Sequence, residues 1–139
     1  LAQQAINCKG DGRHVLVIVD SLHSWAQAAP GNLVEYEALN AAIQSIRKLA
    51  AVIDCPVLAV AERNRASMGG GGLSAGAGTR KIEYGAETVI DLGRDDDPDP
   101  TTGEVAVTVK LAKNRNGAPG REVDLAFHGA MQRFRDVGR

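Results

Sequence analysis

A carboxylate follows the most apolar short stretch of the chain. Residues 15–19 are all apolar, and they run directly into Asp20. A continuous apolar run of this length is typical of a strand buried on both faces, as in a parallel sheet. Open α/β folds bind ligands at the carboxyl edge of such a sheet, where an Asp holds the Mg²⁺ of a nucleotide directly or through water. Asp20 is therefore a candidate metal and cofactor ligand, and a structural cap on the following segment is the alternative.

A second polar cluster follows the next apolar run. Residues 57–61 have the character of another buried strand, and they are followed by Glu62, Arg63 and Arg65. At the same edge of a parallel sheet, Glu62 would lie beside Asp20 and is a candidate for contacting a terminal phosphate. A solvated turn after a strand is the alternative for this cluster.

A segment rich in Gly, Ala and Ser covers residues 67–78. It lacks the phosphate-binding pattern Gly-x-x-x-x-Gly-Lys-Ser/Thr, because Gly78 is followed by Thr-Arg-Lys. The cations that flank this loop suit contacts to the backbone of a single-stranded nucleic acid; they are Arg63, Arg65, Arg80 and Lys81. A surface loop without a ligand is the alternative.

Two long cations, Lys113 and Arg115, lie in the turn-forming segment Lys-Asn-Arg-Asn-Gly at residues 113–117. On the tip of a hairpin they could reach the phosphate site of another subunit. An arginine supplied in this way stabilises the charge that develops on a transferred phosphoryl group. Both residues are therefore catalytic candidates, and an ordinary basic β-turn is the alternative.

The apolar spacing predicts the elements that position these groups. A helix is expected from an N-cap at Asn32 to the residue before Cys55. Its apolar face recurs at spacings of three and four residues, and comprises Tyr36, Leu39, Ile43, Ile46, Ala50 and Ile53. This helix joins the strands at 15–19 and 57–61, and the order strand, helix, strand predicts a parallel βαβ unit.

The second half of the chain predicts strands. A third strand is expected over residues 88–92, and a hairpin is expected from residues 105–111 and 122–127. Residues 114–120 join the hairpin strands with strong turn chemistry. A short edge element is expected over residues 131–134. The expected fold class is α/β, with a mostly parallel sheet and a C-terminal β-hairpin.

The composition excludes several classes of protein. The 139 residues carry a net charge of −1, so any nucleic-acid contact requires a local basic patch. Cys8 and Cys55 are far apart and the histidines are scattered, which predicts reduced thiols in a cytoplasmic protein and no zinc site. No apolar run approaches the roughly 20 residues of a membrane helix.

Taken in order, these segments resemble the DnaB-type hexameric replicative helicases. Those proteins carry an apolar strand ending in Asp, a helix, a strand followed by a polar sensor and Asn-Arg, and a loop. A Gly-Ser-Ile-Glu-like segment, another strand and a Lys-x-Arg-Asn-Gly hairpin follow. The resemblance runs from about Val15 to Phe134, and its later matches are Ile82-Glu83, Lys113 to Gly117 and Arg133-Phe134.

The resemblance implies a partial RecA-like fold in which residues 1–139 are the C-terminal portion of one ATPase domain. It implies an ATP-dependent DNA helicase that uses ATP and Mg²⁺, binds single-stranded DNA and assembles as a hexamer. Asp20 would hold Mg²⁺, while Lys113 and Arg115 would act on the γ-phosphate of a neighbour. This chain has Glu62 where the family usually has Gln. The family's phosphate-binding loop and catalytic glutamate lie upstream of the counterpart of Val15, so the chain alone is expected to be inactive.

Two other interpretations remain open, and the first is another RecA-fold ATPase. The repair protein RadA carries a Lys-Asn-Arg-x-Gly motif, and RepA-like plasmid helicases share the Asp-Ser/Thr-Leu-His pattern seen at residues 20–23. Either of these would change the biology and keep the chemistry. A non-catalytic α/β module that binds a partner protein is an alternative of another class, and the sequence upstream would distinguish it from a motor.

Overall fold

The computed structural model describes most of the chain: residues 2–10, 14–28, 33–62, 82–95 and 97–137. Contacts within the chain group its residues into two compact units, 1–85 and 86–139. Each unit is described by itself below. In the described part of the chain, no helix has the length and apolar character needed to cross a bilayer.

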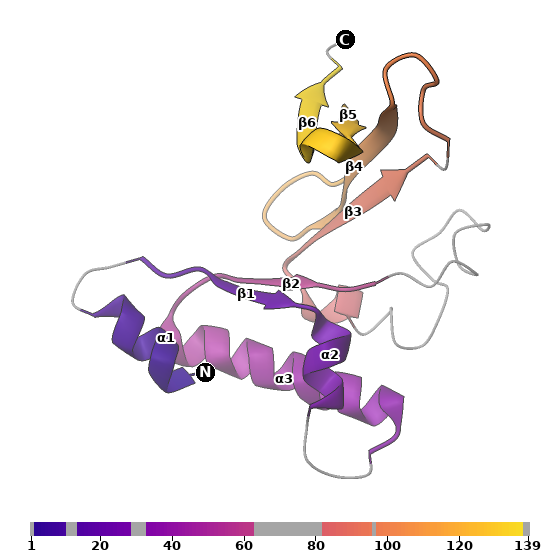
Figure 1. Ribbon diagram of the computed structural model, residues 1–139. Coiled ribbons are helices and arrows are strands. Elements are labelled where there is room, and N and C mark those ends of the chain that lie inside the picture. Colours follow the sequence, from indigo (N-terminus) through magenta and orange to yellow (C-terminus); the bar gives the residue numbers. More distant parts are fainter. Residues whose placement is uncertain (1, 11–13, 29–32, 63–81, 96, 138–139) are drawn as a thin grey trace. The chain divides into compact units, whose positions relative to one another are not determined.

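The first unit contains a parallel βαβ arrangement (Figure 1). In chain order its elements are α1 (Ala2–Lys9), β1 (Val17–Asp20), α2 (Leu22–Gln27), α3 (Glu35–Ile53) and β2 (Val57–Val60). β1 pairs in parallel with β2, and α3 lies between them in the chain. The predicted βαβ unit is therefore confirmed.

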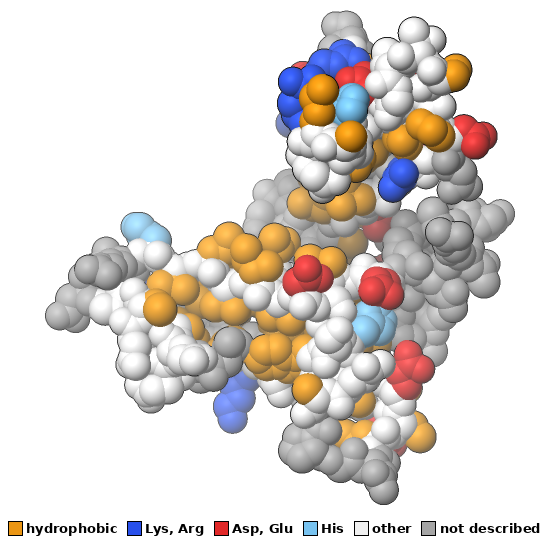
Figure 2. All heavy atoms as spheres, viewed as in Figure 1, with side chains coloured by type: hydrophobic (Ala, Val, Ile, Leu, Met, Phe, Trp, Pro, Cys, Tyr) orange, Lys and Arg blue, Asp and Glu red, His pale blue; other side chains and the backbone are white. Residues whose placement is uncertain are grey.

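β1 is buried on one face only. Val17 and Val19 are buried in the core that the helices form, whereas the Ile18 side chain between them is 61% exposed. The expectation of burial on both faces is therefore wrong for the described residues, because the three helices lie on one side of β1 and β2 (Figure 1). Apolar side chains gather over the other side (Figure 2), where the open apolar face comprises Leu16, Ile18, Leu58 and Val60.

α3 supplies most of the core of the first unit. Its buried side chains follow the predicted helical spacing in part and are Ala38, Leu39, Ala42, Ile46 and Ile53. The N-cap is Val34, without a side-chain hydrogen bond, so the predicted cap at Asn32 is wrong; Asn32 itself lies outside the described residues. The helix ends at Ile53, before Cys55, as predicted. Lys9 Nζ donates to the carbonyl oxygen of Asp54 at 2.9 Å, which satisfies an acceptor at the helix C-terminus.

The second unit is a four-stranded antiparallel sheet in the order β3-β4-β5-β6. Its elements are β3 (Thr88–Arg94), β4 (Glu104–Asn114), β5 (Glu122–His128), the 3₁₀ turn η2 (Gly129–Met131) and β6 (Arg133–Asp136). The predicted hairpin and edge element are confirmed. The prediction of a mostly parallel sheet is not, because every pairing in this larger sheet is antiparallel.

A short connection explains the antiparallel pairing of β3 with β4. Residues 95–103 join the two strands, whereas a parallel crossover needs a dozen or more residues. Asp99 organises the turn, because its Oδ1 accepts hydrogen bonds from the backbone N–H groups of Thr101 at 2.7 Å and Thr102 at 2.8 Å. The bond from Thr102 and, to a lesser extent, the bond from Thr101 lower the pKa of the Asp99 carboxyl.

Cross-strand ion pairs stabilise the same sheet. Arg135 Nη2 lies 2.6 Å from Glu104 Oε2, and the hydrogen bond from Arg135 lowers the pKa of Glu104. Lys110 Nζ lies 2.6 Å from Glu122 Oε1, and that hydrogen bond raises the pKa of Lys110. The Lys110–Glu122 pair supports the register of β4 against β5. The Glu104–Arg135 pair links β4 to β6 across β5.

Candidate functional site

The carboxyl ends of β1 and β2 bring two predicted site residues to one edge of a sheet. Asp20 is the last residue of β1 and pairs with Val60, the last residue of β2; Glu62 follows two residues later. Both carboxylates are exposed. Because the strands are parallel, their carboxyl ends share the edge at which open α/β folds bind ligands.

The turn after β1 is capped by Ser21. Ser21 is the N-cap of α2, and its Oγ accepts a hydrogen bond from the backbone N–H of Ser24 at 3.4 Å. Leu22 then enters the core with 2% of its surface exposed. Ser21 therefore caps α2. The alternative for Asp20, that it caps the following segment, is wrong.

The edge fits the protein's share of a magnesium site. Mg²⁺ prefers oxygen ligands, keeps several waters, and is commonly held by one or two carboxylates plus substrate phosphates. Exposed carboxylates at Asp20 and Glu62 suit that pattern. Among the residues that the structure describes, no group of three or more His, Cys, Asp or Glu could hold a metal by itself. A Gly-Lys pair occurs nowhere in the 139 residues, so the chain lacks the phosphate-binding pattern Gly-x-x-x-x-Gly-Lys-Ser/Thr.

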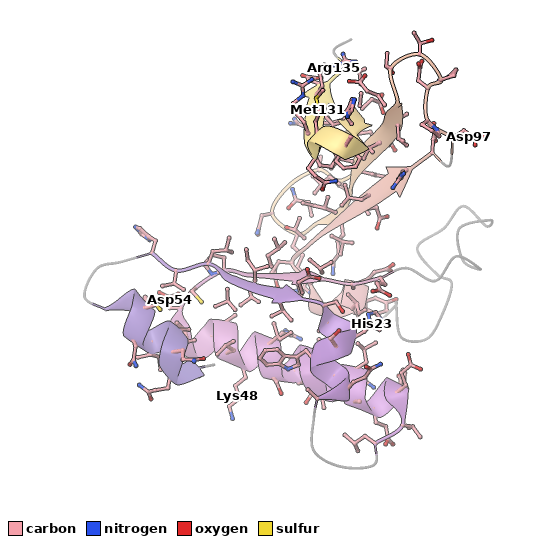
Figure 3. All side chains as sticks on the ribbon, in the orientation of Figure 1. His23, Lys48, Asp54, Asp97, Met131 and Arg135 are labelled. Carbon is pink, nitrogen blue, oxygen red and sulfur yellow. The ribbon has the colours of Figure 1, made fainter. Side chains whose placement is uncertain are left out.

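A hollow of about 310 Å³ lies between α2 and the start of α3. His23, which Figure 3 labels on α2, lines it together with Leu33 and Leu39. His23 Nδ1 is buried and has no hydrogen-bond partner among the described residues. Neither Asp20 nor Glu62 lines the hollow, so it is separate from the sheet edge.

The structure places the two predicted catalytic cations differently from each other. Arg115 lies in the connection between β4 and β5, as expected. Lys113 lies within β4, where it pairs with Val89 of β3, so its predicted place in the turn is wrong. The reason is that β4 continues past its last pairing with β5, Lys110 opposite Glu122, and its residues 113 and 114 pair with β3.

Residues 86–87 hold both cations. Lys113 Nζ donates to the carbonyl oxygen of Ala86 at 2.8 Å. The backbone N–H of Arg115 donates to the carbonyl oxygen of Glu87 at 3.0 Å, and Arg115 Nη1 lies 2.8 Å from Glu87 Oε1. Glu87 is not among the residues predicted from the sequence. Only the register of β3 against β4, which sets Thr88 opposite Asn114, could have indicated it.

Asn114 shapes the turn that carries Arg115. Its Oδ1 accepts a hydrogen bond from the backbone N–H of Asn116 at 3.1 Å. A Cβ at Gly117 would come within 3.0 Å of Asn114 Nδ2, so a larger residue there would press on the turn. Asn114 and Gly117 thus have local structural roles in the turn, in addition to the roles proposed for its cations.

The predicted nucleic-acid contacts lie outside the described residues. They are Arg63, Arg65, Arg80 and Lys81. A helical turn over residues 82–85 comes directly after them in the chain, and Ile82 packs against the core of the first unit. A Cβ at Gly85 would meet Ile43 Cγ2 at 2.8 Å, so the Ile43 side chain or the turn would have to shift to admit a larger residue.

Solved structures share this fold across nearly the whole chain. A DnaB-like replicative helicase, described with its interactions with primase, has a TM-score of 0.78 and 22% identity over 99% of this chain and 35% of its own. A second solved structure, an ATPase domain, has a TM-score of 0.77 and 23% identity over 98% of this chain and 49% of its own. The RadB recombinase is less similar, with a TM-score of 0.53 and 16% identity over 99% of this chain and 59% of its own. The chain therefore has a mixed α/β fold that it shares with these structures.

The sequence is similar to one family across both units. The model of the family described as "DnaB-like helicase C terminal domain" matches residues 1–136, and the chain belongs to that family. The Replicative DNA helicase DnaB of Treponema pallidum (strain Nichols) is 34% identical over 100 residues, which are 71% of this chain and 21% of that protein. The resemblance inferred from the sequence is confirmed. The chain spans about a fifth of the length of this relative.

Proposed function

We propose that this chain is the C-terminal part of an ATP-driven DNA helicase, in which hydrolysis of Mg²⁺-bound ATP drives movement along single-stranded DNA. The observation that carries the proposal is the family match over residues 1–136, which includes both compact units. On this proposal the two units belong to one RecA-like domain. The complete protein is then a cytoplasmic replication enzyme that works as a hexamer.

Asp20 holds the magnesium ion in this proposal, and Glu62 lies beside it on the same edge of the sheet. When bound, Mg²⁺ neutralises charge on the phosphates and orients them. A carboxylate at position 62 would repel a phosphate directly, so in this proposal Glu62 acts through the metal ion. The exposure of both side chains supports these roles, because the metal and the nucleotide must reach them.

Arg115 and Lys113 complete the nucleotide site of the adjacent subunit. An arginine donated between subunits stabilises charge that grows in the transition state of phosphoryl transfer. Residues 86–87 of the same chain hold both side chains. This support favours the proposal, because a catalytic group acts best from a defined position.

Single-stranded DNA contacts Arg63, Arg65, Arg80 and Lys81 through its phosphates. Because the chain has a net charge of −1 and no general basic field, DNA binding requires a local basic patch, which these four cations provide in this proposal. Phosphate contacts of this type bind DNA without reading its sequence, as a translocating motor requires.

The test compares the full-length protein with its Asp20→Asn variant. We expect ATP hydrolysis that single-stranded DNA stimulates, strand separation on a forked duplex, and loss of both in the variant. A full-length protein that folds and assembles but neither hydrolyses ATP nor separates strands would instead be a partner-binding module. Residues 1–139 alone should release no phosphate above buffer; release that Asp20→Asn abolishes would contradict the assignment of the missing parts.

A further inference from the structure

Glu87 contacts Arg115 twice, through its backbone and through its side chain. The carbonyl oxygen of Glu87 accepts the backbone N–H of Arg115 at 3.0 Å. Its carboxylate Oε1 lies 2.8 Å from Arg115 Nη1. The same residue therefore fixes where the Arg115 backbone lies and toward which side the guanidinium extends.

We propose that Glu87 is a positioning residue that orients the Arg115 guanidinium for the nucleotide site of the adjacent subunit. The inference rests on the proposed function, in which Arg115 acts between subunits. It adds a residue that touches neither nucleotide nor DNA and acts only through Arg115. The direction of its effect follows: loss of the carboxylate should slow hydrolysis at the site that receives Arg115.

The geometry favours positioning over sequestration of Arg115. The bond from Nη1 to Oε1 restricts the directions in which the guanidinium can extend. The Arg115 side chain is 44% exposed and that of Glu87 is 61% exposed, so both remain accessible to a neighbouring subunit. An exposed carboxylate in water reduces the field of the cation only weakly.

Confinement is the physical source of the expected rate effect. A free arginine side chain samples many rotamers, and ordering it in the transition state costs conformational entropy. Glu87 restricts that sampling before the reaction begins. Exposed ion pairs of this kind are weak, which corresponds to roughly a 2- to 5-fold change in rate.

The first experiment measures steady-state ATP hydrolysis by the full-length protein and three variants. Glu87→Gln keeps the size of the side chain and the backbone contact but removes the charge, and should lower kcat roughly 2- to 5-fold without changing KM for ATP. Glu87→Asp retains a carboxylate and should recover most of the rate. Glu122→Gln is the matched control, because Glu122 forms a comparably exposed pair with Lys110 in the same sheet, and it should leave kcat unchanged.

Mixed hexamers provide a readout that a merely structural role would not move. Arg115→Ala subunits have an intact nucleotide pocket and no arginine to donate. Subunits with a disabled phosphate-binding loop can donate Arg115 but cannot hydrolyse ATP. Activity of the mixture should fall when Glu87→Gln is placed in the arginine-donating subunit, and should not change when it is placed in the Arg115→Ala subunit.

The possible failures are distinguishable. If Arg115→Ala hydrolyses ATP normally, the proposed function of Arg115 is wrong and the inference fails with it. If Arg115→Ala is inactive while Glu87→Gln behaves like Glu122→Gln, only the inference is overturned. A higher kcat for Glu87→Gln would also overturn it, because Glu87 would then be holding Arg115 away from its target.

Discussion

The sheet edge of the first unit and the β3–β4 pair of the second unit position their candidate residues by different means. Asp20 and Glu62 take their places from the ends of two parallel strands, and the cap that turns the chain away after β1 is Ser21. Lys113 and Arg115 take theirs from an antiparallel register and from hydrogen bonds to residues 86–87. The first arrangement leaves its carboxylates exposed to a ligand, and the second holds its cations in place.

This difference suits the two kinds of group. A carboxylate that binds Mg²⁺ shares the coordination with waters and phosphates, so it needs access more than rigid support. An arginine that acts on a transition state must be placed accurately, and its long side chain has many rotamers to lose. Changes at the sheet edge should therefore affect metal and nucleotide binding, whereas changes at Arg115 should affect the rate after binding.

The largest expected effect is that of Arg115→Ala in the full-length protein. Arginines donated to phosphoryl-transfer sites contribute roughly 10³ to 10⁵ in rate, so kcat should fall by about that factor while ATP binding and assembly remain. Arg115→Lys should recover little, because an ammonium cannot reproduce the planar donor geometry. Hydrolysis rates and nucleotide titrations measure the two quantities. Equal losses in ATP binding and in rate would mean that Arg115 contacts the nucleotide already in the ground state. The proposed difference between the sheet edge and Arg115 would then be wrong.

Asp20→Asn should have the next largest effect. Loss of a carboxylate that holds a metal through water costs roughly 10- to 100-fold in metal affinity or activity. We expect the Mg²⁺ concentration for half-maximal hydrolysis to rise, and excess Mg²⁺ to restore part of the rate. Ser21→Ala is a useful control, because it removes the α2 cap beside Asp20 and leaves the carboxylate in place. If Ser21→Ala shifts the Mg²⁺ concentration for half-maximal hydrolysis and Asp20→Asn does not, the effect comes from folding of the turn.

Neutralising Arg63, Arg65, Arg80 and Lys81 together should weaken binding to single-stranded DNA. The slope of log affinity against log salt should become shallower by roughly 0.7 for each phosphate that the variant no longer neutralises. Binding titrations across a salt series in the full-length protein measure this slope. A control at another surface neutralises two exposed cations of α3, Arg47 and Lys48. An unchanged slope in the fourfold variant would remove this segment from the path of the DNA.

Gly85→Ala should destabilise the first unit by about 1–3 kcal/mol, because the new methyl group has no room beside Ile43. Denaturant unfolding of the full-length protein measures the change. Gly129→Ala is the matched control, since nothing lies within 4 Å of a Cβ at that position. Recovery of stability in the double variant Gly85→Ala with Ile43→Leu, which lacks the Cγ2 methyl group, would identify the close contact as the cause.

The smallest expected effect concerns pH and the Glu104–Arg135 pair. The hydrogen bond from Arg135 lowers the pKa of Glu104 in the folded state, so folding favours the charged carboxyl. The pair's stabilisation is therefore fully present above the ordinary pKa of glutamate and is lost as the pH falls through the lowered value. Thermal unfolding of the wild type should lose a small contribution across this acidic range, and Glu104→Gln should not show that loss. Identical pH profiles for the two proteins would mean that the pair adds no measurable stability.

The sequence by itself determined the local elements and the family. The apolar runs, the helical spacing of α3 and the turn chemistry between β4 and β5 each depend on residues close in the chain, so periodicity and propensity were sufficient to predict them. The ordered set of motifs identified the family, and the match over residues 1–136 confirms it. The same reasoning placed Asp20 at the end of a strand, because an apolar run that stops at a carboxylate is itself a local pattern.

Only the tertiary structure decided which strands pair and which faces are covered. Residues 88–92 have the character of a strand in any sheet, and their antiparallel pairing with β4 depends on the short connection at residues 95–103. The exposure of Ile18 depends on which side of β1 the helices occupy. The contact between Glu87 and Arg115 joins residues 28 positions apart, and it exists because β4 continues alongside β3 beyond the end of its pairing with β5. A cross-strand register of this kind has no counterpart in local sequence, since it is set by the pairing of the whole strand.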